Sequence, residues 1–410
     1  MPSMIDRCAG LDIHQATVVA TVRIPDDHGD RQVITETFGT TTAALVTLRD
    51  WLQAYGVTHV AMESTGVYWK PVYYLLEDAF TLVLVNMQQL TLVPGRKSDV
   101  RDSAWLAQLL EWGLLRGSLV PPPPIRELRE LTRYRKHQIR DRTREVNRLH
   151  RVLQDAGIKL STVATDVMGV SGRAMLEALL QGTTDPLILA DLAKGKLRKK
   201  LPALREALAG RFRPPHRFLI GQILAKVDFL DDTIASLTEE IDRVVAPFEA
   251  TLANLDTIPG VDRKGAITII AETGGDMSRF PTAGHLCSWG AMCPGQNESA
   301  GKRRSGKTRH GNRYLRGTLI ECGLATTRAK ATALQARYYR VKRHGGHKKA
   351  VVAVGHQILE IAYYLMRDGT TYQELGADYF DRRHRDRAIR RHVHQLEALG
   401  YRVTLEEPAA

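Results

Sequence analysis

Two adjacent β-strands are predicted by the segment CAGLDIHQATVVATVRI, residues 8–24, in which apolar and β-branched residues dominate. Residues 32–38 alternate between apolar and polar side chains and predict a third strand. The next predicted elements are a helix, a strand, a helix and a strand, at residues 42–55, 59–63, 67–79 and 81–86. Three strands followed by alternating helices and strands are typical of an α/β layer with a mixed sheet.

Four consecutive prolines at 121–124 predict a domain boundary, because this stiff run interrupts regular secondary structure. A helix expected at 99–115 closes the unit before them. A long helix with ten Lys and Arg residues is predicted at 125–153. Residues 220–248 then show strict 3-4 apolar spacing, which predicts a coiled-coil seam. Its partner is either the 125–153 helix or a second subunit, and a core helix of a bundle is an equally good interpretation.

The charge is unevenly distributed along the 410 residues, which carry 58 Lys and Arg against 45 Asp and Glu, a net charge of +13. Residues 1–120 have a net charge of −4, whereas residues 121–410 have a net charge of +17. An acidic N-terminal unit joined to a strongly basic remainder predicts a polyanionic partner that the second part binds. The alternative is a basic surface that only keeps the protein soluble.

Cysteine content and hydropathy exclude several protein classes. The four cysteines are sparse and form no C-x-x-C pair, so neither a disulfide framework nor a zinc knuckle is expected. The chain has no run of 18 apolar residues, and residues 1–25 lack the pattern of a signal peptide. We therefore expect a soluble, cytoplasmic bacterial protein that has no membrane partner.

Four carboxylates of the N-terminal unit stand where a metal site needs them. Asp12 ends the first predicted strand, in GLDIH, and Glu63 ends another, in AMESTG. Asp99 and Asp102 are three residues apart, so a helix presents both on one face. Such oxygen ligands suit two Mg²⁺ ions, which can stabilise the attacking and leaving oxygens of a phosphoryl transfer. The alternative is that Asp99 caps its helix and Asp102 is a solvated first-turn acid.

A second segment with reactive potential is CPGQNESAGKRRSGK, residues 293–307. A serine hydroxyl in this cation-rich loop can attack a phosphodiester while Arg303 and Arg304 bind its oxygens. The alternative is a solvated basic loop that touches DNA without reacting. Residues 301–308 also match the phosphate-loop pattern G-x-x-x-x-G-K-[ST], but residues 294–300 are not expected to form the buried strand that this motif requires. ATP binding is therefore not expected.

The turn LDTIPGV at 255–261 resembles a helix-hairpin-helix, whose backbone N–H groups can hold a DNA phosphate. A plain helix–helix turn is the alternative. The candidate nucleic-acid contacts lie on the basic helix, in this turn and around the serine loop: Arg133, Arg135, Lys136, Arg140, Arg144, Arg148, Gly260, Lys302, Arg303, Arg304, Lys307, Arg309, Asn312 and Arg316.

The sequence resembles the DEDD transposases of the one-ten family of insertion sequences, which are relatives of the Piv-type DNA invertases. The resemblance extends over about residues 7–367. Its motifs occur in the family's order: GLDIH, AMESTGVYW, KSDVRDSAWLAQLL, LRELTRYRKHQIRDRTREVNRLHRVL, LDTIPGV and SAGKRRSGKTRHGNRYLRGTLIECG.

The resemblance implies a fold of class α/β plus α. Its parts are a RuvC-like, ribonuclease-H-type DEDD domain, a helical coiled-coil domain and a mainly α transposase domain, at 1–120, 125–250 and 251–370. A charged tail at 371–410 follows, whose arginines could bind nucleic acid or, as we favour, belong to a solvated helix. It also implies that the four acids bind Mg²⁺ and that Ser299 is the nucleophile. The family's serine usually stands directly before glycine. Here Ala300 follows Ser299, whereas Ser305 precedes Gly306, so Ser305 is the runner-up.

The resemblance further implies that a structured RNA from the element, a bridge RNA, pairs with donor and target DNA, so that base pairing selects the sites. It implies self-association as a dimer or tetramer, with acids and serine meeting across subunits, and no use of ATP. The expected activity is the cutting and rejoining of DNA. The alternatives are a metal-dependent Holliday-junction-type nuclease without a covalent intermediate, an RNA-independent DNA invertase, and a catalytically silent nucleic-acid-binding protein.

Overall fold

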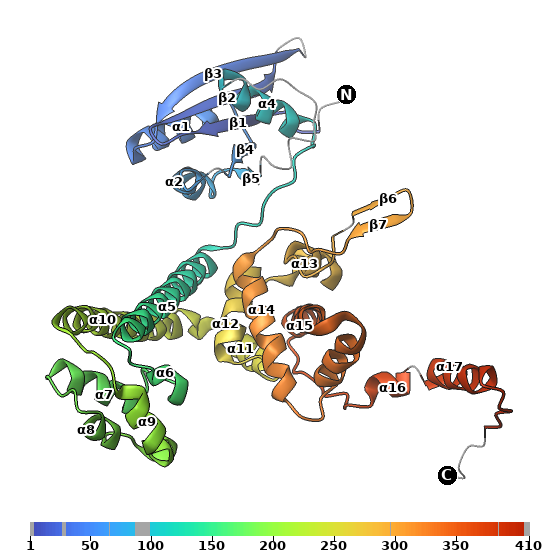
Figure 1. The fold of residues 1–410 in the computed structure, drawn as a ribbon. Helices are drawn as coiled ribbons and strands as arrows, with labels where there is room; N and C mark the ends of the chain where they lie inside the picture. The colour runs from blue at the N-terminus through green and yellow to red at the C-terminus, as the bar shows by residue number, and fades with distance from the viewer. Residues whose placement is uncertain are drawn as a thin grey trace. The chain divides into compact units, whose positions relative to one another are not determined.

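The computed structural model describes residues 4–26, 30–64, 66–86, 99–295, 297–383 and 385–405 (Figure 1). The chain forms two compact units, which meet in sequence between Pro121 and Pro122. None of the helices in these ranges combines the length and the apolar character that crossing a membrane requires.

The first unit is built on a mixed five-stranded sheet in the order β3-β2-β1-β4-β5 (Figure 1). Its strands are β1 (Cys8–Ile13), β2 (Thr17–Pro25), β3 (Arg31–Gly39), β4 (His59–Glu63) and β5 (Thr81–Val85). β2 is antiparallel to β1 and β3, whereas β4 is parallel to β1 and β5. The predicted mixed sheet is therefore confirmed. The order and directions of its strands are consistent with a ribonuclease-H-type domain.

Helices cover both faces of this sheet. One face packs against apolar side chains of α1 (Thr42–Ala54) and α2 (Trp69–Leu76) in a core that includes Leu11, Leu48 and Leu76. The opposite face packs against α4 (Asp99–Glu111), with Cys8 and Leu109 in the smaller core. Since side chains alternate along a strand, the residues of β1 are shared between these two cores.

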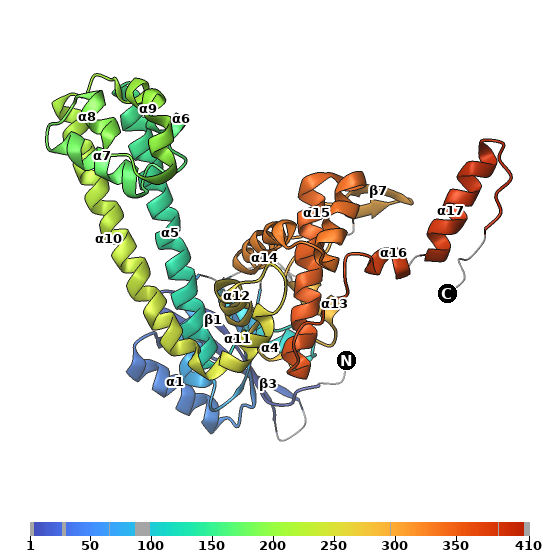
Figure 2. The ribbon, with the colours of Figure 1, turned by 90° about the horizontal axis from the view of Figure 1, so that it is seen from below.

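The second unit begins with an arm of two long helices, α5 (Pro123–Asp155) and α10 (Pro214–Val245) (Figure 2). Asp155 hydrogen-bonds His216 and Arg135 hydrogen-bonds Thr238, so the two helices run antiparallel. The apolar period predicted at 220–248 therefore packs within the chain, and its buried positions include Ile220, Val227 and Leu230.

One end of the arm carries a cap of short helices, which form their own apolar core together with the ends of α5 and α10 (Figure 2). The cap accounts for the region around 160–216, which has no clear sequence pattern. Its elements are α6 (Leu160–Val163), α7 (Val170–Leu180), α8 (Pro186–Asp191), the 3-10 helix η1 (Gly195–Lys200) and α9 (Leu201–Leu208).

A mainly helical module follows the arm. Its α-helices are α11 (Glu249–Asp256), α12 (Arg263–Thr273), α13 (Ala283–Trp289), α14 (Arg313–Ala325) and α15 (Ala333–Asp368). Its short 3-10 helices are η2 (Ala246–Phe248), η3 (Met277–Arg279) and η4 (Thr326–Arg328). A hairpin of β6 (Asn297–Ser299) and β7 (Lys302–Ser305) lies between α13 and α14. Three residues of 294–300 form β6, which pairs only with β7 and is not the buried strand that a phosphate loop requires.

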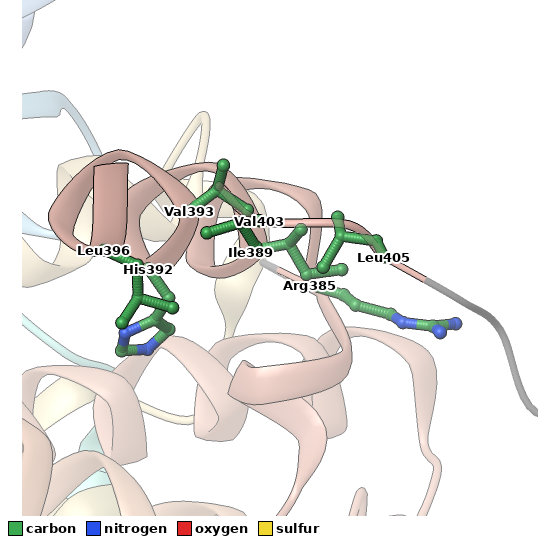
Figure 3. A pocket seen from close by; sticks show the side chains of 7 residues that line it. All are labelled: Arg385, Ile389, His392, Val393, Leu396, Val403 and Leu405. Carbon is green, nitrogen blue, oxygen red and sulfur yellow. The ribbon is translucent and has the colours of Figure 1, made fainter. Parts of the chain in front are cut away.

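The chain ends in two basic helices, α16 (Tyr379–Arg383) and α17 (Arg385–Ala398). Figure 3 shows a small apolar pocket of about 380 Å³ here, where the segment after α17 returns toward the helix. Val403 and Leu405 line it together with Ile389 and Leu396. Leu396 and Leu405 remain 43% and 63% exposed, so this packing is shallow.

Candidate catalytic and nucleic-acid sites

Asp12 and Glu63 stand at the same edge of the sheet, on neighbouring parallel strands. Leu11 of β1 pairs with Met62 of β4, and the two carboxylates are the next residues of the two strands. Alternation places Asp12 on the face of Cys8 and Glu63 on the face of Ala61, which is the face that packs against α4. Both predicted ligands therefore approach α4 from the carboxyl ends of their strands.

The direction of α4 brings its first turn to that edge. Cys8 Sγ donates a hydrogen bond to the Ala107 carbonyl oxygen, and Thr21, which pairs with Gly10, hydrogen-bonds Ser103 Oγ at 2.7 Å. Higher residue numbers of β1 thus face lower residue numbers of α4. The start of the helix, which holds Asp99 and Asp102, lies at the Asp12 end of β1. Asp102 is half-buried, whereas the side chain of Asp99 lies outside the described atoms.

Gly10 permits this close approach between strand and helix. A Cβ at residue 10 would collide with the Ser103 carbonyl oxygen and would lie 2.5 Å from the Ala107 backbone nitrogen. Only a residue without a side chain fits there. This glycine of the GLDIH motif therefore helps to set the distance between Asp12 and the first turn of α4.

Asp12 is a buried carboxylate that has a histidine beside it. Its residue is 7% exposed, and Oδ2 lies 3.2 Å from Nε2 of the exposed His14. His14 is the last residue of the GLDIH motif, and the sequence predicted no role for it. The only available signal was its i, i+2 spacing from Asp12 at a strand end. A buried acid at a strand end is unfavourable unless a cation compensates it, and an oxygen-rich donor set suits a hard divalent ion.

The structure brings two of the four predicted acids, Asp12 and Glu63, to one edge of the sheet. Among the side chains that the structure describes, no three of His, Cys, Asp and Glu converge into a metal-binding group. The side chain of Asp99 lies outside this comparison. The side chain of Asp102 is described, but it does not form such a group with Asp12 and Glu63, so the common metal site of the four acids stays a prediction.

The candidate nucleophile lies at the tip of the β6–β7 hairpin in the second unit. Ser299 ends β6 and pairs with Lys302 across a two-residue turn. Ala300 has a φ of 51° and Gly301 a φ of 72°, as in the tight turns that suit β-hairpins. The left-handed conformation after Ser299 favours glycine, so this position is conformationally glycine-like although alanine occupies it.

Ser305 has a different environment. It ends β7, is half-buried, and its Oγ accepts a hydrogen bond at 3.2 Å from the backbone N–H of Lys307. A hydroxyl that orders the following turn is the usual behaviour of serine at a strand end. Described cations next to the hairpin include the exposed Lys302, Lys307 and Arg309, whereas the side chains of Arg303 and Arg304 lie outside the described atoms.

A buried carboxylate that the sequence did not identify connects α5 of the arm to the start of α14, which follows the hairpin. Glu272 of α12 is fully buried and accepts two hydrogen bonds from the Arg133 guanidinium, at 2.8 and 2.7 Å. Asn312, which caps α14 directly after the hairpin region, donates to Glu272 Oε2 at 2.6 Å. Arg129 Nε lies 3.7 Å from the same carboxylate. A lone acid within the apolar run AITIIAET was the signal that could have identified it.

Arg133 is therefore engaged inside the protein. Burial disfavours its charge, but the hydrogen bonds and charge of Glu272 outweigh this and raise the pKa of the Arg133 guanidinium. Its guanidinium carbon also lies 4.7 Å from the ring centre of Tyr314. Arg133 contributes to the junction of α5, α12 and α14 whether or not nucleic acid is bound.

Other predicted nucleic-acid contacts on α5 also have internal partners. Arg135 donates to Thr238, and the remaining pairs are Lys136 with Glu321, Arg144 with Asp141 and Arg148 with Glu145. Most of these ion pairs are exposed, so each contributes little to stability and can open when a phosphate competes. Arg140 is exposed, and its guanidinium lies 5.9 Å from the ring centre of Tyr314. Arg316, another predicted contact, lies on α14 and is half-buried.

Gly260 of the helix-hairpin-helix-like turn has a packing reason as well. Its φ is 89°, and a Cβ would lie 2.7 Å from the Cys322 carbonyl oxygen of α14. The turn borders a pocket of about 610 Å³, which residues of α5, α10, α12 and α14 line. The structure thus ties Gly260 to α14, and its contact with DNA stays a prediction.

Comparison with known proteins gives two family matches. Residues 9–158 match a transposase family of IS110 elements with a DEDD domain, and residues 252–339 match the "Transposase IS116/IS110/IS902 family". The chain is 29% identical over 331 residues to the "Insertion element IS900 uncharacterized 42 kDa protein" of Mycobacterium paratuberculosis, which covers 71% of this chain and 80% of that protein.

A shorter similarity points the same way. The chain is 31% identical over 123 residues to the "Insertion element IS110 uncharacterized 43.6 kDa protein" of Streptomyces coelicolor, covering 29% of each protein. The matched regions contain both the acid-bearing sheet edge and the serine hairpin. The chain belongs to the IS110 family of insertion-sequence transposases, enzymes that act on DNA.

Proposed function

We propose that this transposase cuts and rejoins donor and target DNA by attack of Ser299, assisted by divalent cations at the acid-bearing sheet edge. The observation that carries the proposal is that Asp12 and Glu63 stand at the same edge of the sheet, on the face that packs against α4, whose first turn lies at that edge. Phosphoryl transfer needs charge stabilisation at the attacking and leaving oxygens. A carboxylate-lined edge that binds cations meets this need.

Asp12, Glu63, Asp99 and Asp102 would hold two Mg²⁺ ions. The bound cations supply positive charge that stabilises the pentacovalent phosphate and the leaving oxygen. His14, beside Asp12, would orient that carboxylate and limit the positions that its oxygens can take. The close packing of α4 at Gly10 fixes the separation between the ligands of strand and helix.

Ser299 would act as the nucleophile from the tip of the hairpin. Its Oγ–P bond forms, one P–O bond of the DNA backbone breaks, and the cut strand leaves with a free hydroxyl. The hydroxyl of the exchanged strand then attacks the phosphoserine and restores the serine. The phosphodiester energy is conserved in the protein–DNA link, so rejoining needs no ATP. The glycine-like φ of Ala300 supports Ser299 over Ser305, because the family's serine usually precedes glycine.

An element-encoded bridge RNA would select donor and target sites by base pairing. The protein then needs contacts to nucleic-acid backbones more than contacts to base edges. The net charge of +17 over residues 121–410 and an aromatic content of 6% support this division of labour. Acids and serine lie in separate units of one chain, and we propose that they meet across subunits of a dimer or tetramer.

A search for a covalent adduct tests the mechanism. Purified protein, the element's RNA and nicked suicide DNA substrates are mixed with Mg²⁺, denatured, and digested for peptide mass spectrometry. A nucleotide on Ser299 is expected, and one on Ser305 would move the nucleophile while keeping the mechanism. Cleaved DNA without any adduct would instead support the hydrolytic, Holliday-junction-type nuclease. Recombination that survives RNase treatment would support the RNA-independent invertase.

A further inference from the structure

A group of cations surrounds a sharp break in α15, far in sequence from the serine hairpin. Gly346 interrupts the helix with φ 76° and ψ 171°. Five exposed cations flank the break, and we name them the α15 corner: Arg340, Lys342, Arg343, Lys348 and Lys349.

The α15 corner lies in a stretch of sequence without acids. The sequence between Glu321 and Glu360 contains eight Lys and Arg residues and no acid. Within the described ranges, no member of the corner forms an ion pair with a carboxylate, in contrast to Lys136 with Glu321 on α5. Two of the cations lie over aromatic rings, Arg340 over Phe380 and Lys342 over Tyr338 and Tyr339. Cations in such density repel one another, so an external anion stabilises this surface.

The position of two of these cations carries a further cost. Lys348 and Lys349 stand in the first turn after the break, where the partial positive charge of the helix end opposes additional cations. Most helices place Asp or Glu at such positions and place Lys or Arg at the opposite end. Lys348 and Lys349 therefore break the usual charge preference of a helix start. Exposed residues that break such a preference are often ones that serve binding.

The shape of the corner is held from within. The hydroxyl group of Tyr338, a residue only 4% exposed, hydrogen-bonds Nδ1 of His347 at 2.7 Å across the break. The rings of these two residues lie 5.9 Å apart. This contact ties the two halves of α15 together, so the cations on either side keep a defined arrangement before any partner arrives.

We propose that the α15 corner is a binding surface for the phosphodiester backbone of nucleic acid, separate from the serine hairpin and from α5. Charge rather than apolar area would supply the affinity. Between residues 334 and 350, all of which the structure describes, Tyr339 is the one large hydrophobic residue that is exposed. Arg and Lys side chains on two helix segments that meet at an angle can contact successive phosphates. We take the partner to be the DNA duplex that the enzyme recombines, because the corner and the serine hairpin belong to the same unit of the chain. Binding of a structured RNA instead is an outcome of the test.

The test measures binding by the full-length protein to a labelled DNA duplex and, separately, to a structured RNA of matched length, as a function of salt. The variants are K348A/K349A and K342A/R343A, one pair on each side of Gly346. The logarithm of the DNA-binding constant should fall less steeply with the logarithm of salt concentration, by about 0.9 for each phosphate that the variant no longer neutralises. A reduced slope with DNA supports the proposal, whether or not RNA binding changes as well, and a reduced slope with RNA alone would overturn the choice of DNA as the partner.

The control is R205A/R243A, which removes two exposed charges that are paired with Asp191 and Glu240. Salt slopes of both corner variants equal to the slope of this control, with both ligands, would overturn the proposal. Circular dichroism and thermal unfolding verify that each variant is folded, and the two corner pairs test the surface independently. Because the readout is binding without cleavage, failure of the Ser299 mechanism leaves the result interpretable.

Discussion

Gly10 of β1 and Ser103 of α4 approach so closely that the glycine cannot carry a side chain without colliding with the Ser103 carbonyl oxygen. This contact links the strand that ends in Asp12 to the helix that begins at Asp99. The geometry of the proposed metal site therefore depends on a residue that provides no ligand.

The first prediction concerns this contact. Gly10→Ala should destabilise the first unit by about 1–3 kcal/mol, because overpacking forces α4 away from the sheet. Chemical denaturation measures the change. Gly117→Ala is the matched control, since a Cβ there would meet Val83 at an ordinary distance of 3.7 Å. Equal stability of the two variants would show that α4 does not need the close approach.

Removal of a proposed metal ligand is the second prediction. Millimolar Mg²⁺ should raise the thermal unfolding temperature of the wild-type protein, because a ligand that binds only the folded state stabilises it. Asp12→Asn should abolish this rise. Asp50→Asn, which changes an exposed acid on α1 paired with Arg49, should keep it. A rise of the same size in the Asp12 variant would contradict the assignment of Asp12 as a ligand.

Glu272 gives the third prediction. Glu272→Gln should lower stability by roughly 3–5 kcal/mol, because it leaves the Arg133 guanidinium partly buried without its counter-charge. Glu321→Gln breaks the exposed pair with Lys136 and should cost about 1 kcal/mol or less. Urea titrations of the two variants provide the comparison. Similar losses in both would mean that the buried pair contributes no more than a surface pair.

The fourth prediction follows from the backbone at Ala300. Ala300→Gly should stabilise the hairpin by about 1 kcal/mol, because glycine adopts a positive φ without strain. Adduct formation on Ser299 should persist. Ala325→Gly, at the exposed end of α14, should have the opposite sign, since glycine weakens helices by about 1 kcal/mol. Loss of the adduct in the Ala300 variant would contradict the proposal that a glycine-like conformation at residue 300 is what the reaction of Ser299 needs.

The cysteines provide a pH-dependent prediction. Burial, followed by the nearby Glu111, raises the pKa of the Cys8 thiol to about 11 in the folded protein. A neutral buried thiol therefore contributes stability that is complete below the ordinary thiol pKa of about 9. This contribution is lost as pH rises from about 9 toward 11, since the unfolded chain ionises first. Cys8→Ala should flatten the decline of stability over that range, and an unchanged decline would refute the assignment.

The sheet and its acids were predictable because their signals are local. Apolar runs mark β1 and β4, and the acids at their ends become neighbours once the two strands lie parallel. Glu272 was not predictable as a partner of Arg133, because the contact joins α12 to a helix more than a hundred residues earlier. The arginines of α5 looked like a uniform basic face in the sequence. Only the packing of α10, α12 and α14 separates the internally paired ones from those that remain exposed.

The choice between two serines shows the same limit at a smaller scale. Ser305 precedes glycine in the sequence, whereas Ser299 precedes alanine. The backbone adds an observation that the sequence does not give, because Ala300 has the conformation that glycine usually supplies. Residue identity is a proxy for φ, and the proxy fails where a hairpin forces an alanine into the left-handed region.

The antiparallel course of α5 and α10 also makes the arm adjustable in length. α5 begins and α10 ends at the same base, so equal insertions in the two helices would move the cap outward without altering the junction at Glu272. Each added heptad would extend the reach by about 10 Å, at 1.5 Å per residue. The length of the arm can therefore change independently of the module that follows it.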